Sequence, residues 1–184
     1  MSERGRISGA SICAQREAIK KKLGAAHYAQ FLERLDPGDR AAWTSATSVG
    51  WLPIELADHT IRVAAQVAGA EHDSFRDTIL GMSIEGSFKT IWRLLISLTS
   101  DEALIARSGS FVRRAFDRGE AAARLLSPGS GEFVVSQWPD MPDRALHGLR
   151  IATQKILELS GRHNVHVTVS RLPDGARYRM SWRR

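Results

Sequence analysis

Arginine residues near the end of the chain are the clearest chemical feature of this sequence. Residues 107–184 carry 14 lysine and arginine residues against seven aspartate and glutamate residues, and Lys155 is the only lysine among the 14. The preceding 106 residues carry 12 cationic against 13 anionic residues, so the formal charge of +6 arises wholly in the C-terminal part. A planar guanidinium group binds phosphate and carboxylate groups through paired hydrogen bonds, which the ammonium group of lysine cannot do.

The closing stretch VHVTVSRLPDGARYRMSWRR places some of these arginines on one predicted surface. The stretch alternates between apolar and polar residues, turns at Pro-Asp-Gly and alternates again, which is typical of a β-hairpin with one buried face. Arg177, Arg179 and Arg183 then share the outward face, and we expect them to be candidates for binding an anion. The alternative is that these arginines only keep the outer face of a sheet in water.

A second group of arginines lies beside aromatic residues in the stretch SGSFVRRAFDRG. Arg113 and Arg114 stand between Phe111 and Phe116, and interleaved arginine and aromatic side chains can clamp phosphates or stack on bases. We therefore expect Arg113 and Arg114 to be further candidates for binding an anion. The alternative is an amphipathic segment whose phenylalanines enter the core while its arginines reach water.

Side chains for metal binding or nucleophilic catalysis do not occur at the spacing that such sites need. The six histidines form no pair on a common predicted face, apart from His163 and His166 at the start of a strand. Cys13 has no histidine near it in the sequence, and neither a Gly-x-Ser-x-Gly elbow nor a Gly-x-x-x-x-Gly-Lys phosphate loop occurs. Asp101 and Glu102 stand at a predicted helix start, where they favour the helix dipole. We expect no metal, no cofactor and no catalytic residue.

The chain holds five tryptophans, more than packing usually demands. Tryptophan is enriched in ligand pockets and at protein interfaces. Trp51 and Trp138 lie close to prolines at predicted element boundaries, so we expect each of them at a pocket rim or a dimer contact. Trp92, on a predicted helix, is a third candidate, with core filling as its alternative.

Composition indicates a folded protein of the cytoplasm. The sequence is 43% hydrophobic and 25% charged, which is ordinary for a globular chain, and its single cysteine excludes an internal disulfide framework. The N-terminal stretch MSERGRISGAS lacks the apolar segment of a signal peptide. Charged residues interrupt every apolar patch well short of the length that spans a bilayer, so we expect no membrane contact.

Helical periodicity dominates the first part of the chain. Proline and glycine boundaries and apolar residues three and four positions apart predict helices over 10–24, 25–39, 51–69, 71–100 and 100–109. Gly81 and Gly86 weaken the long helix over 71–100, so we expect a break or a close helix contact near them.

The period changes from helical to alternating after Phe116. Two hairpins, over 119–139 and 165–184, flank a helix over 142–161, which predicts a four-stranded antiparallel sheet after a helical bundle, an α+β fold. We expect residues 1–11 to be flexible and residues 12–184 to form a single domain. Its helical part covers 12–118 and its sheet part 119–184.

The order of these landmarks resembles an uncharacterised family of conserved proteins best known from myxobacteria. The stretches that carry the resemblance are GWLPIELADHTI, LGMSIEGSFKTIWRLL, ALHGLRIATQKILELSG and YRMSW, within residues 12–183. More distantly, helices followed by hairpin, helix and hairpin are similar to four-vinyl-reductase-type sensors, heme nitric-oxide-binding domains and TRAPP subunits. That resemblance implies a ligand-binding or dimerising regulatory domain and supplies no activity.

The resemblance does not carry over the cofactors of these families. Heme nitric-oxide-binding domains hold heme with one helical histidine and a Tyr-x-Ser-x-Arg motif. His59 and His147 lie on predicted helices, but the motif is absent, and YRMSWRR departs from its spacing. A single cysteine also excludes the cysteine-rich cluster of some vinyl-reductase-type sensors.

The sequence therefore predicts a non-catalytic regulatory module that forms a homodimer and binds a small apolar ligand or a protein partner. The ligand is expected in an apolar cavity between the helical bundle and the sheet. The alternative is an anion-binding module for nucleic acid or a cyclic dinucleotide that uses the C-terminal arginines. Replacement of Arg177, Arg179 and Arg183 by alanine is expected to abolish anion binding and to leave the thermal midpoint nearly unchanged.

Overall fold

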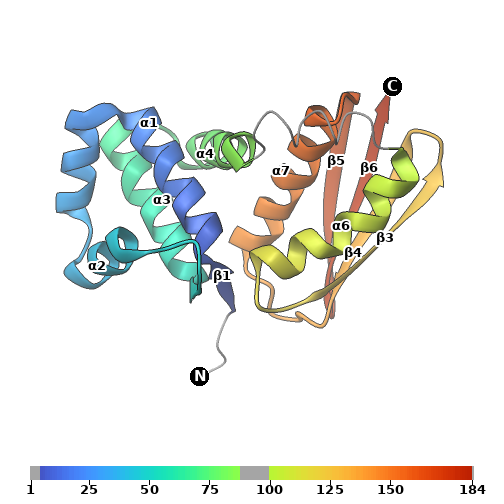
Figure 1. Cartoon of the computed structure of the whole chain (residues 1–184), viewed down its shortest axis with the longest axis horizontal. Helices are drawn as coiled ribbons and strands as arrows, with labels where there is room; N and C mark the ends of the chain where they lie inside the picture. The colour runs from blue at the N-terminus through green and yellow to red at the C-terminus, as the bar shows by residue number, and fades with distance from the viewer. Residues whose placement is uncertain (1–4, 88–99, 184) are drawn as a thin grey trace. The chain divides into compact units, whose positions relative to one another are not determined.

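A computed structural model describes residues 5–87 and 100–183, with the side chains of 106–108 excepted. The described residues form two compact units, Gly5–Ser87 and the part from residue 100 to Arg183 (Figure 1). The first unit is helical and the second contains the four-stranded sheet, so the predicted α+β class is confirmed. Among the described residues, no helix combines the length and the apolar character that a membrane crossing requires.

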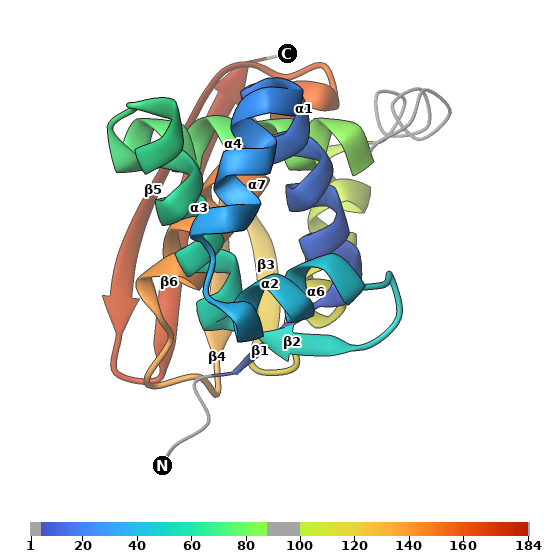
Figure 2. The same ribbon diagram turned by 90° about the vertical axis from the view of Figure 1, so that its left-hand side faces the viewer.

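The first unit contains four helices and a two-stranded sheet (Figure 2). The elements are β1 (Arg6–Ser8), α1 (Gly9–Arg34), α2 (Pro37–Ser45), β2 (Trp51–Pro53), α3 (Ile54–Ala68) and α4 (His72–Ser87). Local sequence sets several helix ends: the Ser8 hydroxyl accepts a hydrogen bond from the Ser11 N–H at the start of α1, and Gly69 ends α3 in the left-handed conformation. Helices α1, α3 and α4 pack on one another.

Two boundaries in this unit differ from the expectation in detail. Arg6–Ser8, within the segment predicted to be flexible, pair as β1 with β2. Helix α1 joins the two predicted helices across a kink at Gly24, whose φ of 70° and ψ of 171° are not helical. Helix α4 continues through Gly81 and Gly86 as far as Ser87, and the rest of the predicted helix, with Trp92, lies outside the described residues.

A buried glutamine ties α1 to α3 inside the first unit. The Gln15 side-chain amide donates to the Ala57 carbonyl at 2.9 Å and to the Thr60 hydroxyl at 3.0 Å. These bonds replace the hydrogen bonds with water that the buried Gln15 amide loses on folding. The apolar core around Gln15 includes Ile12, Ile19, Phe31, Trp43 and Ile61.

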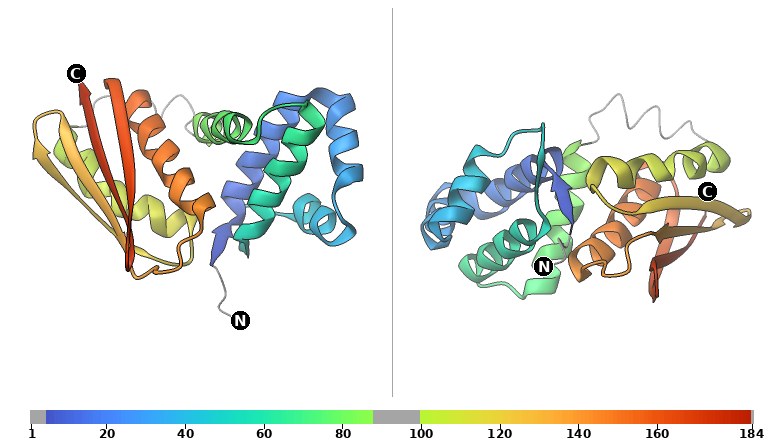
Figure 3. Two further views of the ribbon diagram at one scale, coloured as in Figure 1. Left: turned by 180° about the vertical axis from the view of Figure 1, so that it is seen from behind. Right: turned by 90° about the horizontal axis from the view of Figure 1, so that it is seen from below.

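The second unit is a four-stranded antiparallel sheet with two helices on one side (Figure 3). Its elements are α6 (Asp101–Ala115), β3 (Glu120–Ser127), β4 (Ser130–Ser136), α7 (Asp143–Leu159), β5 (His163–Leu172) and β6 (Gly175–Arg183). The strand order β3-β4-β6-β5 places one strand of each hairpin at the centre. The predicted hairpin, helix and hairpin are confirmed. The compact units do not follow the predicted division at residue 118, because α6 packs on β3.

The inner face of the sheet, which α6 and α7 cover, is apolar. Ala176, Tyr178, Met180 and Trp182 of β6 are buried, as the alternation of the closing hairpin predicts. The Tyr178 hydroxyl donates to the Leu146 carbonyl of α7 at 3.0 Å, which fixes this helix on the sheet.

A buried ion pair joins the start of α6 to the start of β5. The Arg162 guanidinium donates from Nε at 3.0 Å and from Nη2 at 2.6 Å to Asp101 Oδ1, and its Nη1 donates to the Ser160 carbonyl. Both side chains are less than a tenth exposed. Loss of one partner leaves the other charge buried, which costs more than the pair itself contributes.

We expect Asp101→Asn to lower the free energy of unfolding of the second unit by about 3–5 kcal/mol. Native-state hydrogen exchange of the β5 and β6 amides measures this loss without requiring both units to unfold together. The matched control is Asp58→Asn, which removes the partner of the exposed Arg62 on α3 and should cost its unit about 1 kcal/mol or less. Equal losses in the two variants would contradict a buried-charge role for Asp101.

Candidate functional site

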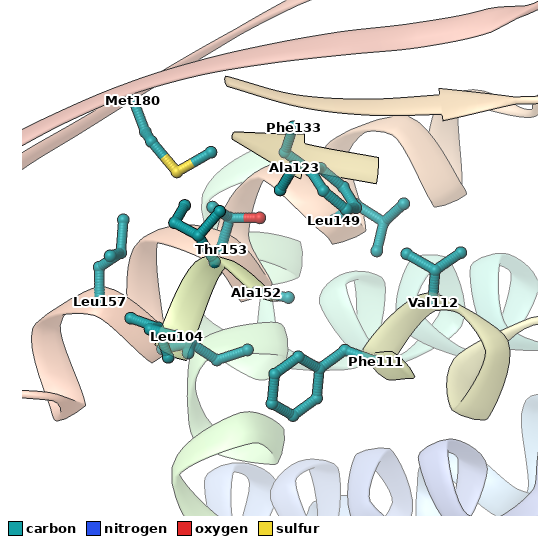
Figure 4. A pocket seen from close by; sticks show the side chains of 12 residues that line it. Leu104, Phe111, Val112, Ala123, Phe133, Leu149, Ala152, Thr153, Leu157 and Met180 are labelled. Carbon is teal, nitrogen blue, oxygen red and sulfur yellow. The ribbon is translucent and has the colours of Figure 1, made fainter. Parts of the chain in front are cut away.

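An apolar cavity lies between α6, α7 and the inner face of the sheet (Figure 4). Its volume is about 60 Å³. Five elements of the second unit line it, with Leu104, Ile105, Phe111, Val112, Ala123, Phe133, Leu149, Ala152, Thr153, Ile156, Leu157 and Met180. The cavity is thus a feature of tertiary packing and not of one local segment.

Helical spacing on α7 builds the largest part of the wall. Positions 149, 152, 153, 156 and 157 follow the three-and-four repeat of one helix face. The sheet wall contains a small residue, Ala123, between larger neighbours, and Ala152 is its small counterpart on α7. The sequence predicted a helix over 142–161, but it gave no sign that one face of this helix borders a space.

The side chains that line the cavity are almost all apolar. The Thr153 hydroxyl is the one polar side-chain group among the 12 lining residues. An apolar lining of this kind favours small apolar molecules, because water finds few hydrogen-bond partners along it. The arrangement can therefore bind a small apolar ligand, and it offers no group for acid-base or nucleophilic chemistry.

Neither Trp51 nor Trp138 is among the described residues that line this cavity. Trp138 is fully buried against Phe116, with ring centroids 5.3 Å apart, so the structure places it in the core and not at a rim or a surface contact. Trp51 is 43% exposed on β2 of the first unit and stays a candidate for a partner contact. Trp92 lies outside the described residues.

The outer face of the sheet carries a cluster of arginines around one glutamate. Glu132 of β4 stands directly across from Arg124 of β3 and from Arg179 of β6. Arg124 Nη2 lies 2.9 Å from Glu132 Oε1, while Arg177 Nε and Arg179 Nε lie 3.4 Å and 3.5 Å from Oε2. Arg183 is exposed further along β6. We call Arg124, Glu132, Arg177, Arg179 and Arg183 the arginine face.

Sequence reasoning selected three members of the arginine face and missed Arg124 and Glu132. A buried glutamate in a strand of otherwise small and apolar residues was the available signal, but its partners belong to other strands. The hydrogen bond from Arg124, with the charges of Arg124 and Arg177, holds the pKa of Glu132 below its ordinary value.

The arginine face corrects one expectation. Replacing Arg177, Arg179 and Arg183 together cannot be neutral for stability, because two of them neutralise the Glu132 carboxylate, whose side chain is only 7% exposed. A charge so poorly solvated depends on its partners. Variants that remove Arg177 or Arg179 therefore need a stability control.

Arg113 and Arg114 belong to a different surface. Both are exposed in the last turn of α6, where cations favour the helix dipole. Phe116 is buried and Phe111 lines the apolar cavity, so neither ring is available to stack on a base. The structure thus divides the five proposed arginines between α6 and the outer face of the sheet.

The first unit contains a carboxylate and histidine cluster that sequence reasoning did not find. Asp36, Asp39 and His59 each offer a ligand atom, and these atoms lie within 4.8 Å of one another. His59 Nδ1 contacts Asp39 Oδ2 closely, and Asp36 accepts the Asp39 N–H at 2.9 Å as the cap of α2. This backbone hydrogen bond is the main cause that lowers the pKa of Asp36. The cluster joins α2 to α3, and the three atoms are of the types that coordinate a divalent ion.

Comparison with known proteins identifies the fold. The chain matches no model of a protein family, and no curated protein matches its sequence. Among solved structures, an Fe(II) unliganded H-NOX protein from K. algicida is 9% identical, with a TM-score of 0.69 over 96% of this chain and 97% of that chain. An H-NOX protein from S. oneidensis in the Fe(II)NO state is 10% identical, with a TM-score of 0.70 over 96% and 99%.

A third H-NOX domain, described as oxygen binding and related to soluble guanylate cyclases, is 10% identical, with a TM-score of 0.64 over 96% and 95%. The predicted likeness to the heme nitric-oxide-binding fold is therefore confirmed at the level of fold. The comparisons lend no support to the predicted resemblance to a myxobacterial family.

Heme does not fit either of two pockets in the described residues. Heme iron takes axial ligands from His, Cys, Met or Tyr, and only Met180 of these types lines the 60 Å³ cavity. A groove of about 480 Å³ between α1 and α4 contains Cys13 and Met82, but the charged side chains of Glu17, Lys21 and Glu85 line it as well, unlike the apolar surroundings that a porphyrin ring needs. No histidine lines either pocket, and the sequence has no Tyr-x-Ser-x-Arg motif.

The lowered pKa of Glu132 predicts how stability depends on pH. Its ionised form is favoured in the folded state, so this stabilisation is complete above the pKa of an unfolded glutamate and is lost as the pH falls through the folded-state pKa. We expect the stability difference between the wild type and Glu132→Gln to shrink as the pH falls from about 6 to about 3. Urea denaturation across this range measures it.

The control for this prediction is Glu120→Gln, which changes an exposed glutamate on the same outer face. We expect it to differ little from the wild type throughout. A constant difference between the wild type and Glu132→Gln at every pH would show that the carboxylate is not selectively stabilised when ionised.

Proposed function

We propose that this chain is a non-catalytic sensor module that binds a small apolar molecule directly, without heme, in the cavity between α6, α7 and the sheet. The observation that carries the proposal is a space of about 60 Å³ with an apolar lining in the folded core of the second unit. The lining offers water few hydrogen-bond partners, so an apolar molecule there gains contacts that water does not make.

The fold comparison supports a sensor of small molecules. Of the similar structures, the H-NOX protein from S. oneidensis is in the Fe(II)NO ligation state and the oxygen-binding H-NOX domain is an oxygen complex. A diatomic molecule or another apolar molecule of a few heavy atoms is within the capacity of the cavity. Fold alone does not establish function, so the ligand class follows here from the lining and the volume.

The position of the cavity suggests how binding is transmitted. A ligand there contacts α6 and α7 at once, with the sheet as a fixed floor. A bound ligand favours those conformations in which the spacing between α6 and α7 fits it. Binding therefore shifts the population of conformations and changes the outer surface that these two helices present. The pair Asp101–Arg162 anchors the start of α6, which leaves its remaining turns to respond.

The partner of this module stays a prediction. We propose that Trp51 contributes to a contact with a second copy or another protein. Its large aromatic side chain is 43% exposed, and burial of that side chain in an interface would be favourable. Light scattering of the wild type and Trp51→Ser would show whether a homodimer exists and depends on this residue.

Xenon binding measured by methyl NMR tests the cavity. We expect xenon to shift the methyl resonances of Leu104, Leu149 and Met180, and benzene to leave them unchanged, since the known benzene-binding cavity in another protein has about 150 Å³. Ala152→Val adds two methyl groups to the wall and should abolish the xenon shifts. The matched control Ala26→Val makes the same helical change at an exposed position of α1 and should preserve them.

Two results would overturn the proposal. Xenon shifts that persist in Ala152→Val would place the ligand elsewhere. A hemin titration that gives a ligated Soret band in the wild type, and loses it on substitution of one histidine, would show that the chain is a heme protein after all.

A further inference from the structure

We propose that the arginine face binds the phosphate backbone of duplex nucleic acid without sequence preference. This function goes beyond the proposed sensor, because the face lies on the opposite side of the sheet from the apolar cavity. It rests on five side chains from three adjacent strands, Arg124, Glu132, Arg177, Arg179 and Arg183.

The arginines are arranged in a row. Arg177, Arg179 and Arg183 point to the same side of β6, where alternate residues are about 7 Å apart. Arg124 widens the row across β4, on the other side of Glu132. The strand thus presents guanidinium groups at intervals of about 7 Å and about 14 Å, with Ser181 at the outward position between Arg179 and Arg183.

Glu132 holds the row in place without occupying it. Arg177 and Arg179 approach the carboxylate through Nε, and no contact of their terminal amino groups with another described residue is observed. The side chains of Arg124 and Arg179 are 71% and 66% exposed, whereas Glu132 is 7% exposed. The carboxylate therefore lies beneath the guanidinium groups, which face outward and can donate to a ligand.

Charge on the outer face favours a polyanion. Four arginines stand against two glutamates, Glu132 and Glu120, and Glu120 lies at the far end of β3. The hydroxyls of Thr168, Ser170 and Ser181 lie among the arginines on the same face and supply further hydrogen-bond donors.

The residue types that do not occur on this face narrow the class of ligand further. Histidine, as at His166 of β5, is the one aromatic residue type among its described outward residues, so the face lacks the large phenylalanine, tyrosine or tryptophan rings on which the bases of single strands or of a cyclic dinucleotide stack. A stable protein interface has an apolar centre, but the one large exposed apolar side chain of the second unit is Leu126, near the β3–β4 turn. These features favour a duplex backbone over an acidic protein.

Fluorescence anisotropy of a labelled, random-sequence DNA duplex tests the proposal. We expect the affinity of the full chain to fall steeply between about 50 and 200 mM salt, with a slope of about −0.9 for each phosphate neutralised. Arg183→Gln leaves the contacts of Glu132 intact and should reduce the slope by about 1. The double variant Arg177→Gln/Arg179→Gln should reduce it by about 2, with thermal unfolding as the folding control.

Two further variants make the test specific. Arg113→Gln/Arg114→Gln removes the same charge from α6 and should leave the slope unchanged. Ala152→Val should not affect DNA binding, so failure of the cavity and failure of this face are distinguishable.

Three outcomes would overturn the proposal. The first is no salt-dependent binding to duplex DNA. The second is equal loss of binding in the α6 variant and the β6 variants, which would indicate a general effect of net charge. The third is binding of a polyglutamate peptide under conditions where duplex DNA does not bind, which would assign the face to an acidic protein.

Discussion

The alternation of side chains along β6 is the constraint on which the second unit depends. Ala176, Tyr178, Met180 and Trp182 enter the core, and each residue between them reaches the other face. Because this strand lies between β4 and β5, a shift by one residue would bring its arginines into an apolar core and expose its aromatic rings. The bond from Tyr178 to the Leu146 carbonyl holds the inner side in register, and the contacts with Glu132 hold the outer side.

The two faces of this sheet are suited to opposite chemistries. Both helices of the second unit cover the inner face, where small residues on β3 and α7 leave an apolar space. The outer face has no helical cover among the described residues and carries charge. The two proposed sites, one for an apolar molecule and one for a polyanion, thus lie on opposite faces of one sheet, and its strands connect them.

The H-NOX fold is retained here without the features that would hold heme in the two pockets. Identity near 10% leaves few side chains in common, so what the structures share is the order and packing of their elements. Side chains at a site determine chemistry, and folds accept many different sites. In this chain the cavity lacks a histidine, and the histidine that joins α2 to α3 is engaged with Asp39.

Local signals in the sequence are sufficient to predict most of the helices and strands of the second unit and the two faces of its closing hairpin. Helical and alternating periods, the Pro-Asp-Gly turn and the glycine and proline boundaries are local signals, and they predicted α7, the hairpins and the buried side of β6 correctly. Such signals act over a few residues, so they did not show that α2 and β2 interrupt the predicted helices or that α6 continues to Ala115.

Only the tertiary structure decided which distant residues meet. Glu132 and Arg179 are neighbours because β4 and β6, from different hairpins, pair at the centre of the sheet. Arg113 is separated from that face because α6 packs on the inner side, and the cavity exists because five elements leave a space that none of them encodes alone. Such contacts depend on strand order and helix packing, which local periodicity does not specify.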